Sequence, residues 1–365
     1  GGLYLAAFVF GTALDHLGAK RVVMLSTAVF TASLLWTAWA PSKTHQSDAA
    51  WGTFIVSMGL LSPGFFMSAF VLPHQFNKAR AGMVTTLIIA AFDTSAIVFP
   101  ALLALTKGLG DRWDVIATCY ACSVVVIGAI DIVLLPSPPK LPPLQNDEKL
   151  LEPEVGGEKP DLLVNLRHPC FVGVTLFQAI FSMKNTFFLS SADTQLSYFF
   201  DLPVENVRVA TASHFFNYGL PIGGLLIIPF CSWLLSRDND ILSFGVVTTM
   251  GALHGVLNCL PNEPAQYTAI CIFCLLRPLK WAVFSSFIIS RFPPALMGRL
   301  LGVSNIIVGA VGFVVHPLFL EGLSAGFVRV NAVLTGAELF VGACFLLQIH
   351  RSAAKKPLAA SVQFE

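Results

Sequence analysis

The sequence predicts an all-α polytopic membrane protein, and three observations support this fold class. Hydrophobic residues make up 55% of the chain and charged residues only 12%, whereas soluble domains carry roughly 25% charged residues. The mean hydropathy is +0.73. Apolar stretches of about 20 residues, the length at which a helix spans about 30 Å of hydrocarbon, recur along most of the chain.

We expect eleven membrane helices, because eleven apolar stretches are separated by polar turns. Five precede a long polar segment: 1–14, 22–40, 50–72, 81–105 and 115–135. Six follow it: 170–198, 209–236, 241–260, 265–289, 300–320 and 328–350. The first stretch is short and the chain opens on apolar residues, so we expect one further helix before it and twelve in all.

The polar segment 136–169 divides these helices into two sets. It is rich in Pro, Glu, Lys and Asp and cannot bury a core, so we expect a flexible central loop. The sequence therefore predicts an N-terminal bundle over 1–135, which corresponds to helices 2–6 of the full fold. A C-terminal six-helix bundle is expected over 170–350, with a tail over 351–365.

Basic residues predict which helix ends face the cytosol. If the turn that contains Lys20 and Arg21 is cytosolic, fourteen of the 22 Lys and Arg residues lie on that side, five lie on the other side and three lie within helices. This assignment also makes the central loop and the tail cytosolic. We expect a monomer in the plasma membrane, with an organelle membrane as the alternative. A net charge of +1 gives no electrostatic reason to expect a nucleic acid partner.

The turn between the first two stretches has residue types that hold two helices close together. It reads Gly11-Thr-Ala-Leu-Asp15-His-Leu-Gly18-Ala-Lys20-Arg21. Gly11 allows close helix approach, and Gly18 supplies a tight turn. Asp15 can accept hydrogen bonds from amides at a helix start and pair with a base of the same cluster. Lys20 and Arg21 are expected to hold the turn on the cytosolic face.

This turn resembles the G-x-x-x-D-x-x-G-x-[RK] loop of major facilitator superfamily members. The resemblance implies the major facilitator fold of two helical bundles. It also implies a latch that holds the outward-facing state, and the residues that match the motif are Gly11, Asp15, Gly18, Lys20 and Arg21. His16 and Ala19 replace an Arg and a basic residue of the usual pattern, which weakens the latch interpretation. The alternative is an ordinary basic turn.

Three stretches are similar to solute carrier family 43, the sodium-independent branch for large neutral amino acids, and to its fungal and protozoan relatives. They are GTALDHLGAKRVVMLST, FNKARAGMVTTLIIAAFDTSAIVFPAL, and LLRPLKWAVFSSFI with the Gly298-Arg-Leu-Leu-Gly302 that follows it. This resemblance implies facilitated transport of neutral amino acids. One member of that family carries purine nucleobases, so the family alone leaves the solute open.

Ionisable residues inside membrane helices are costly and are therefore functional candidates. We expect Arg277 to contact the solute, because Lys280 and Trp281 follow it on one helix face. Pro278 removes a backbone hydrogen bond there, and a broken helix beside a cation and an aromatic ring can hold a carboxylate. The alternative is structural, with Arg277 paired to Asp93, because each charge is costly alone. Asp93 is also a candidate for the solute site or for a proton site.

Two further helices carry polar and aromatic residues that can line a solute path. Gln178, Phe181 and Asn185 belong to the first of them. Asn217 and Tyr218 belong to the second, just before Pro221-Ile-Gly-Gly, which predicts a hinge. The alternative is hydrogen bonding between helices, which is worth about 0.6 kcal/mol on average.

Lys184 lies midway along its helix and is a functional candidate for the same reason as Asp93 and Arg277. Glu338 also lies midway along its helix, but we expect Glu338, His254 and His316 to be packing residues that their neighbours satisfy. Two C-x-x-C pairs lie in apolar helices without a nearby His, so neither a metal site nor a redox site is expected.

The leading functional hypothesis is a uniporter of neutral amino acids that works by alternating access, with a lipid bilayer and a small-molecule solute as its partners and without a cofactor. The first rival is a proton-coupled carrier of another solute, such as a nucleobase, that uses Asp93 or Glu338. The second is a transport-inactive receptor or scaffold with the same fold. We do not expect an enzyme, because the sequence has no nucleotide-binding loop and neither an H-E-x-x-H nor a G-x-S-x-G motif.

Overall fold

The computed structural model describes residues 2–39, 48–76, 78–110, 112–135 and 161–354, and every regular element in these ranges is a helix. Eight helical segments there are long and apolar enough to cross a membrane, or nine if one bent pair counts as a span. The expected all-α polytopic membrane fold is confirmed. The chain divides into two units, which we call the first unit (1–160 with 291–306) and the second unit (161–290 with 307–365).

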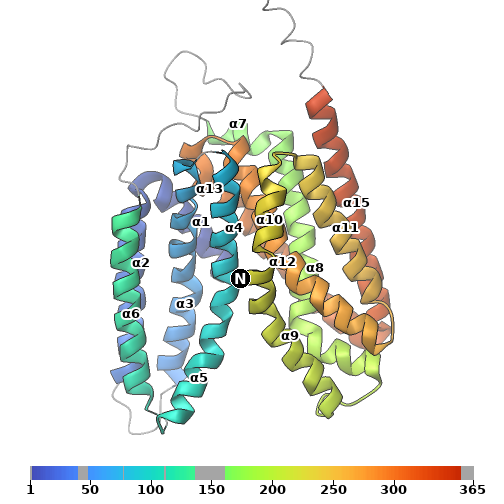
Figure 1. Ribbon diagram of the computed structural model, residues 1–365, viewed down its shortest axis with the longest axis horizontal. Helices are drawn as coiled ribbons and strands as arrows, with labels where there is room; N and C mark the ends of the chain where they lie inside the picture. The colour runs from blue at the N-terminus through green and yellow to red at the C-terminus, as the bar shows by residue number, and fades with distance from the viewer. Residues whose placement is uncertain (1, 40–47, 77, 111, 136–160, 355–365) are drawn as a thin grey trace, which may run out of the picture. The chain divides into compact units, whose positions relative to one another are not determined.

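The first unit is built around α2, which packs against both α3 and α6, while α1 packs against α3 (Figure 1). Its glycines permit this close packing: a Cβ built on Gly128 of α6 would lie 2.4 Å from Oγ1 of Thr27 on α2. The helices of this unit are α1 (Gly2–Leu17), α2 (Ala19–Trp39), α3 (Asp48–Ala69), η1 (Leu72–Gln75), α4 (Lys78–Thr94), η2 (Ser95–Ile97), α5 (Val98–Gly108), α6 (Trp113–Leu134), η3 (Pro294–Leu296) and the first part of α13 (Met297–Gly312).

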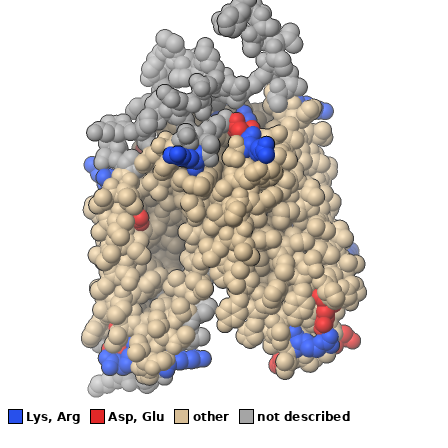
Figure 2. All heavy atoms as spheres, in the orientation of Figure 1, with Lys and Arg blue, Asp and Glu red and all other residues tan. Residues whose placement is uncertain are grey.

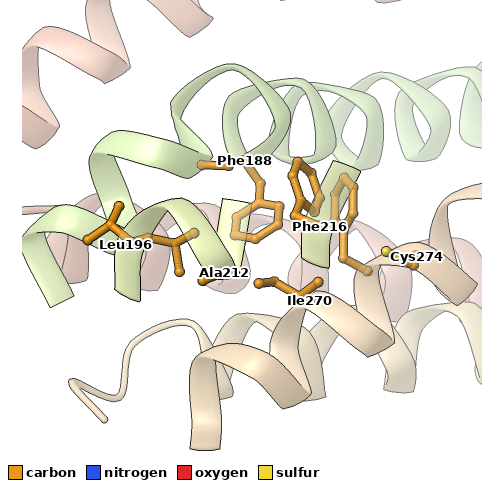
Figure 3. Packing of buried hydrophobic residues seen from close by; sticks show 9 residues of the cluster. Phe188, Leu196, Ala212, Phe216, Ile270 and Cys274 are labelled. Carbon is orange, nitrogen blue, oxygen red and sulfur yellow. The ribbon is translucent and has the colours of Figure 1, made fainter. Parts of the chain in front are cut away.

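In the second unit, α15 packs against both α11 and α8 (Figure 1). An aromatic cluster joins α8, α9 and α12: Phe188 and Phe216 pack edge to face with their ring centroids 5.5 Å apart (Figure 3). The helices of this unit are α7 (Leu162–Arg167), α8 (Pro169–Phe200), α9 (Val207–Leu226), α10 (Ile228–Ser236), α11 (Asp240–Leu257), α12 (Glu263–Arg291), the end of α13, α14 (Val315–Ala325) and α15 (Phe327–Ala354).

Three of the expected membrane helices are interrupted. The stretch 81–105 forms α4 and α5 with the 3₁₀ turn η2 between them, and the stretch 300–320 breaks between α13 and α14. The stretch 209–236 forms α9 and α10, which are bent by 41°. This bend lies at Ile227, whereas Pro221, where we expected a hinge, lies inside α9. Pro229 explains the position, because a proline is favoured in the first turn of a helix, here α10.

The expected central loop is partly helical. Residues 136–160 lie outside the described ranges, but Leu162–Arg167 forms α7. Asp161 caps this helix, because its Oδ1 accepts a hydrogen bond from the backbone N–H of Leu163 at 2.8 Å. His168 in turn caps α8, which begins at Pro169. The tail positions 355–365 also lie outside the described ranges.

Charged side chains are sparse over the middle of the helices on the face drawn in Figure 2 and gather near their ends. An integral membrane protein needs this distribution, because a charge that faces lipid is costly. The charges that do lie within the helices are therefore the most informative residues of the fold.

Candidate functional site

Asp15, in the last turn of α1, binds the first turn of α13. Its Oδ1 accepts a hydrogen bond from the backbone N–H of Gly298 at 3.0 Å. Its Oδ2 accepts one from the backbone N–H of Arg299 at 2.9 Å and one from Nε of Arg299 at 3.0 Å. The first amides of a helix have no partner within the helix and carry its positive dipole end, so a buried carboxylate is well placed there.

Glycines bring the two helices together at this point. A Cβ built on Gly298 would lie 2.2 Å from the carbonyl oxygen of Gly11, and one built on Gly302 would lie 2.7 Å from Cα of Phe8. Gly298 and Gly302 are four residues apart on one face of α13, which is the spacing of small residues at tight membrane-helix contacts. The turn after α1 needs Gly18, whose φ of 80° is in the left-handed region.

The structure gives Asp15 the kinds of partner that the motif predicts, but both partners differ from the expected ones. Asp15 accepts from amides at a helix start, as the sequence suggested, but the helix is α13 and not the next one along the chain. The base that pairs with Asp15 is Arg299, whereas we expected one from its own cluster, such as Lys20 or Arg21. The sequence does not reveal this pairing, because Asp15 and Gly298 are 283 positions apart. The role of these residues as a latch stays a prediction.

We expect Asp15→Asn to lower the stability of the first unit by about 1–3 kcal/mol, because the amide cannot replace the charged acceptor of three hydrogen bonds. A loss of this size corresponds to a fall in melting temperature of roughly 2–4 °C for each kcal/mol. The measurement is a thermal melt of the detergent-solubilised protein. His16→Asn, at the exposed neighbouring position, is the control. Equal melting temperatures for the two variants would contradict the Asp15 contacts.

In the second unit, Lys280 of α12 is the candidate cation with the most closely defined surroundings. Its side chain is buried, with 1% relative exposure. Nζ donates a hydrogen bond to Oγ of Ser182 on α8 at 2.8 Å and lies 5.0 Å from the ring centroid of Trp281. A hydroxyl and an aromatic face can both accept a cation in a dry site.

Ser182 belongs to a buried polar stripe along α8, which we call the α8 stripe. Its members are spaced three or four residues apart and therefore share a helix face: they are Thr175, Gln178, Ser182 and Asn185. Within the described residues, neither amide atom of Gln178 or of Asn185 has a hydrogen-bond partner. Buried polar groups are normally paired, so this face has unused donors and acceptors beside Ser182, the residue that binds Lys280.

Sequence reasoning selected Gln178 and Asn185 but did not recognise the stripe, although the regular spacing of Thr175, Gln178, Ser182 and Asn185 was present in the sequence. Phenylalanines also lie on this helix, at Phe177 and Phe181. One of those phenylalanines, the predicted site residue Phe181, stacks on Phe177 with ring centroids 4.0 Å apart. Phe177 in turn contacts Phe244 of α11 and Phe345 of α15, so these rings take part in packing between helices.

The other predicted site residues are more scattered. Arg277 is half-buried on α12, one turn before Lys280, and Asn217 and Tyr218 are exposed on α9. Asp93 is buried in the last turn of α4, in the first unit, whereas Arg277 belongs to the second unit. The expected pairing of Asp93 with Arg277 stays a prediction.

A second buried polar site lies on the other face of α8. Lys184 forms an ion pair with Glu338 of α15, and the two side chains have relative exposures of 3% and 0%. Nζ of Lys184 also donates to the carbonyl oxygen of Gly251 on α11 at 2.8 Å. We interpreted Lys184 and Glu338 separately from the sequence, and the structure shows that they are partners.

Side-chain amides form a further buried layer between the same three helices. Oε1 of Gln195 on α8 accepts hydrogen bonds from Asn331 of α15 at 2.8 Å and from Asn258, at the end of α11, at 3.1 Å. Polar groups that pair across helices in this way fix which helices pack together. Two separate sets of polar contacts therefore determine how α8, α11 and α15 pack together: the Lys184–Glu338 ion pair and the hydrogen bonds between side-chain amides.

Comparisons with known proteins agree with this architecture. The model of the Major Facilitator Superfamily matches residues 2–317. The structure is similar to that of FucP in its outward conformation, with a TM-score of 0.66 and 14% identity over 94% of this chain and 87% of FucP. It is also similar to the human organic anion transporter MFSD10, with a TM-score of 0.66 and 16% identity over 94% and 80% of the two chains. At these identities the likeness shows a shared fold.

A curated relative matches a smaller part of the chain. Protein FMP42 of Saccharomyces cerevisiae is 23% identical over 145 residues, which is 40% of this chain and 28% of FMP42. The match therefore spans less than a third of the length of that relative. It does not confirm the resemblance to solute carrier family 43.

Proposed function

Because the chain belongs to the Major Facilitator Superfamily, we propose that it moves a small organic solute across a membrane by alternating access, and that this solute is a neutral amino acid. The observation that carries the proposal is the juxtaposition of Lys280 with the α8 stripe. The structural neighbours support a small organic solute, because they include a fucose:proton symporter of E. coli, a human organic anion transporter and a proton:xylose symporter.

The chemistry of this region fits a zwitterion. The ammonium of Lys280, which already binds Oγ of Ser182, can pair with a carboxylate. The amide oxygens of Gln178 and Asn185, which accept no hydrogen bond within the described residues, can accept from an ammonium. Arg277 lies one turn away on the same helix and offers a second cation. An amino acid presents both complementary groups on one carbon atom.

We expect Lys280→Met to reduce uptake of the solute at least about tenfold, which corresponds to the loss of roughly 1.4 kcal/mol of interaction. Methionine fills a similar volume and removes the cation, so the packing of α12 is largely kept. The measurement is uptake of labelled leucine, phenylalanine, arginine and adenine by oocytes at matched surface levels. Ser290→Ala, at an exposed position of the same helix, is the control.

The outcomes of this assay separate the rival functions. Leucine or phenylalanine uptake that survives Lys280→Met would contradict the site, and adenine uptake alone would contradict the solute class. Two of the structural neighbours are described as proton symporters, which favours a proton-coupled carrier as the second candidate. That candidate predicts uptake that collapses with the proton gradient and with Asp93→Asn. A protein that reaches the surface and transports none of the four compounds would favour a receptor or scaffold.

A further inference from the structure

The Lys184–Glu338 ion pair lies in a groove that is formed by two glycines of α11. A Cβ built on Gly251 would lie 2.7 Å from Oε1 of Glu338, and one built on Gly255 would lie 2.8 Å from Nζ of Lys184 and 2.0 Å from Oγ1 of Thr335. Any larger side chain at either glycine would displace the pair. The two glycines therefore leave the space that the two charged groups occupy. Apolar side chains would fill the same space without the desolvation cost of burying two charges.

This site has titratable groups whose hydrogen-bonding capacity is not used. Oε1 of Glu338 has no partner among the described residues, and neither ring nitrogen of His254 has one. His254 is fully buried and packs against Phe188 and Phe273, with ring centroids 4.9 and 5.5 Å apart. Unused acceptors at buried titratable groups are positions where a proton can bind.

Glu338 and His254 are the two groups of this site with a position open for such a proton, and cations lie near both. Lys184 is the charged partner on α8, and the charge of Lys280 on α12 also acts on Glu338. The charge of Lys184 acts on His254 and on Cys259, which follows the end of α11. The helix α14 also packs on α15, and its Glu321 pairs with Arg329 at an exposed position. Both ammonium groups favour the charged carboxylate, whereas burial away from water favours its protonated form.

We propose that Glu338 is a proton-binding site and that its protonation loosens the contact of α8 with α15. A hydronium ion that reaches the site during the conformational cycle would transfer its proton to Oε1, so that an O–H bond of hydronium breaks, an O–H bond forms on Glu338 and a water molecule leaves. The ion pair with Lys184 would become a hydrogen bond between a neutral carboxyl and an ammonium, which is weaker.

This change would be transmitted to the solute site through a single helix. Ser182, which accepts the hydrogen bond of Lys280, lies on α8 two positions before Lys184. A displacement of α8 at Lys184 therefore alters the position of Ser182 and of the α8 stripe. Protonation of Glu338 would therefore set the transport rate. This effect rests on the proposed transport function but not on the identity of the solute.

The direct test is infrared difference spectroscopy of the reconstituted full chain between about pH 8 and pH 5. Protonation of a buried carboxyl adds a C=O stretching band, and we expect Glu338→Gln to lose this band. Glu321→Gln, at the exposed carboxylate, is the matched control and should keep it. A band that is equally strong in Glu338→Gln and in the wild-type protein, or no band at all, would overturn the proposal.

If Glu338→Gln does not fold, a second variant can be used for the same measurement. The double variant Lys184→Met with Glu338→Met removes both charges together, so no buried charge is left without its partner. It should also lack the band. With equal pH on both sides of the membrane, uptake should vary with pH severalfold in the wild-type protein and stay flat in the double variant. The same pH dependence in both proteins would overturn the link from Glu338 to the transport rate.

Discussion

Glu338→Ala is expected to lower the stability of the protein so far that most of the folded protein is lost. The substitution leaves the ammonium of Lys184 buried without its carboxylate, and breaking a buried ion pair in this way costs about 3–5 kcal/mol. Proteins are stable by only about 5–15 kcal/mol, so the loss is a large share of the total. Gly251 would still accept a hydrogen bond from Lys184, but a carbonyl does not neutralise the charge. The measurement is the yield and melting temperature of monodisperse protein in detergent.

The control replaces both partners together. Lys184→Met with Glu338→Met should recover most of the loss, because apolar residues of similar volume often replace a buried ion pair without destabilising the protein. Glu321→Ala breaks the exposed pair with Arg329, whose distance is 3.6 Å, and should change the stability by less than about 1 kcal/mol. If the single Glu338 variant were as stable as the double variant, the burial of this pair would be refuted.

The ion pair shows which part of the site the sequence could not predict. Mid-helix position identified Lys184 and Glu338 as unusual, because charges are costly in a membrane. It could not reveal that they pair, because their partnership depends on which helices are neighbours and joins residues 154 positions apart. The sequence also could not show why α11 has glycines at positions 251 and 255, because the reason is the close packing of α15 against them.

The fold was predictable because apolar length is a direct physical requirement of the bilayer. The expected stretches correspond to helices throughout the described residues, and the boundaries agree within a few positions. The interruptions at η2, at Ile227 and between Gly312 and Val315 were not predicted. Hydropathy is continuous across such breaks, and only local turn chemistry, such as Pro229 in the first turn of α10, locates them.

For the contact of α1 with α13, the sequence predicted the residue types on α1 but not the partner helix. The residue types at Gly11 and Asp15 indicated a close helix approach and an acceptor for backbone amides. The partner was the Gly298-Arg-Leu-Leu-Gly302 stretch, which the sequence showed only as a point of family resemblance. Residues 291–306 belong to the first unit, whereas we expected one C-terminal bundle over 170–350. The packing of these glycines on α1 accounts for that grouping.

Gly298→Ala is expected to separate α1 from α13 and to reduce uptake strongly. The new Cβ would lie 2.2 Å from the carbonyl oxygen of Gly11 and 2.7 Å from Oδ1 of Asp15, so the helices must move apart and the Asp15 hydrogen bonds must lengthen. Overpacking of this kind costs about 1–3 kcal/mol. Loss of the contact would also release the latch that the motif implies. Uptake and melting temperature, measured on the same preparation, report the two effects.

Gly312→Ala, on the same helix, is the matched control. A Cβ there meets nothing within 4 Å, and alanine is a better helix former than glycine by up to about 1 kcal/mol. The two substitutions should therefore change the stability in opposite directions, although their chemistry is identical. Gly11→Ala should resemble Gly298→Ala, and the double variant should be less damaging than the sum of the two, because either methyl group alone already separates the helices. Additive losses would show that Gly11 and Gly298 do not share one contact.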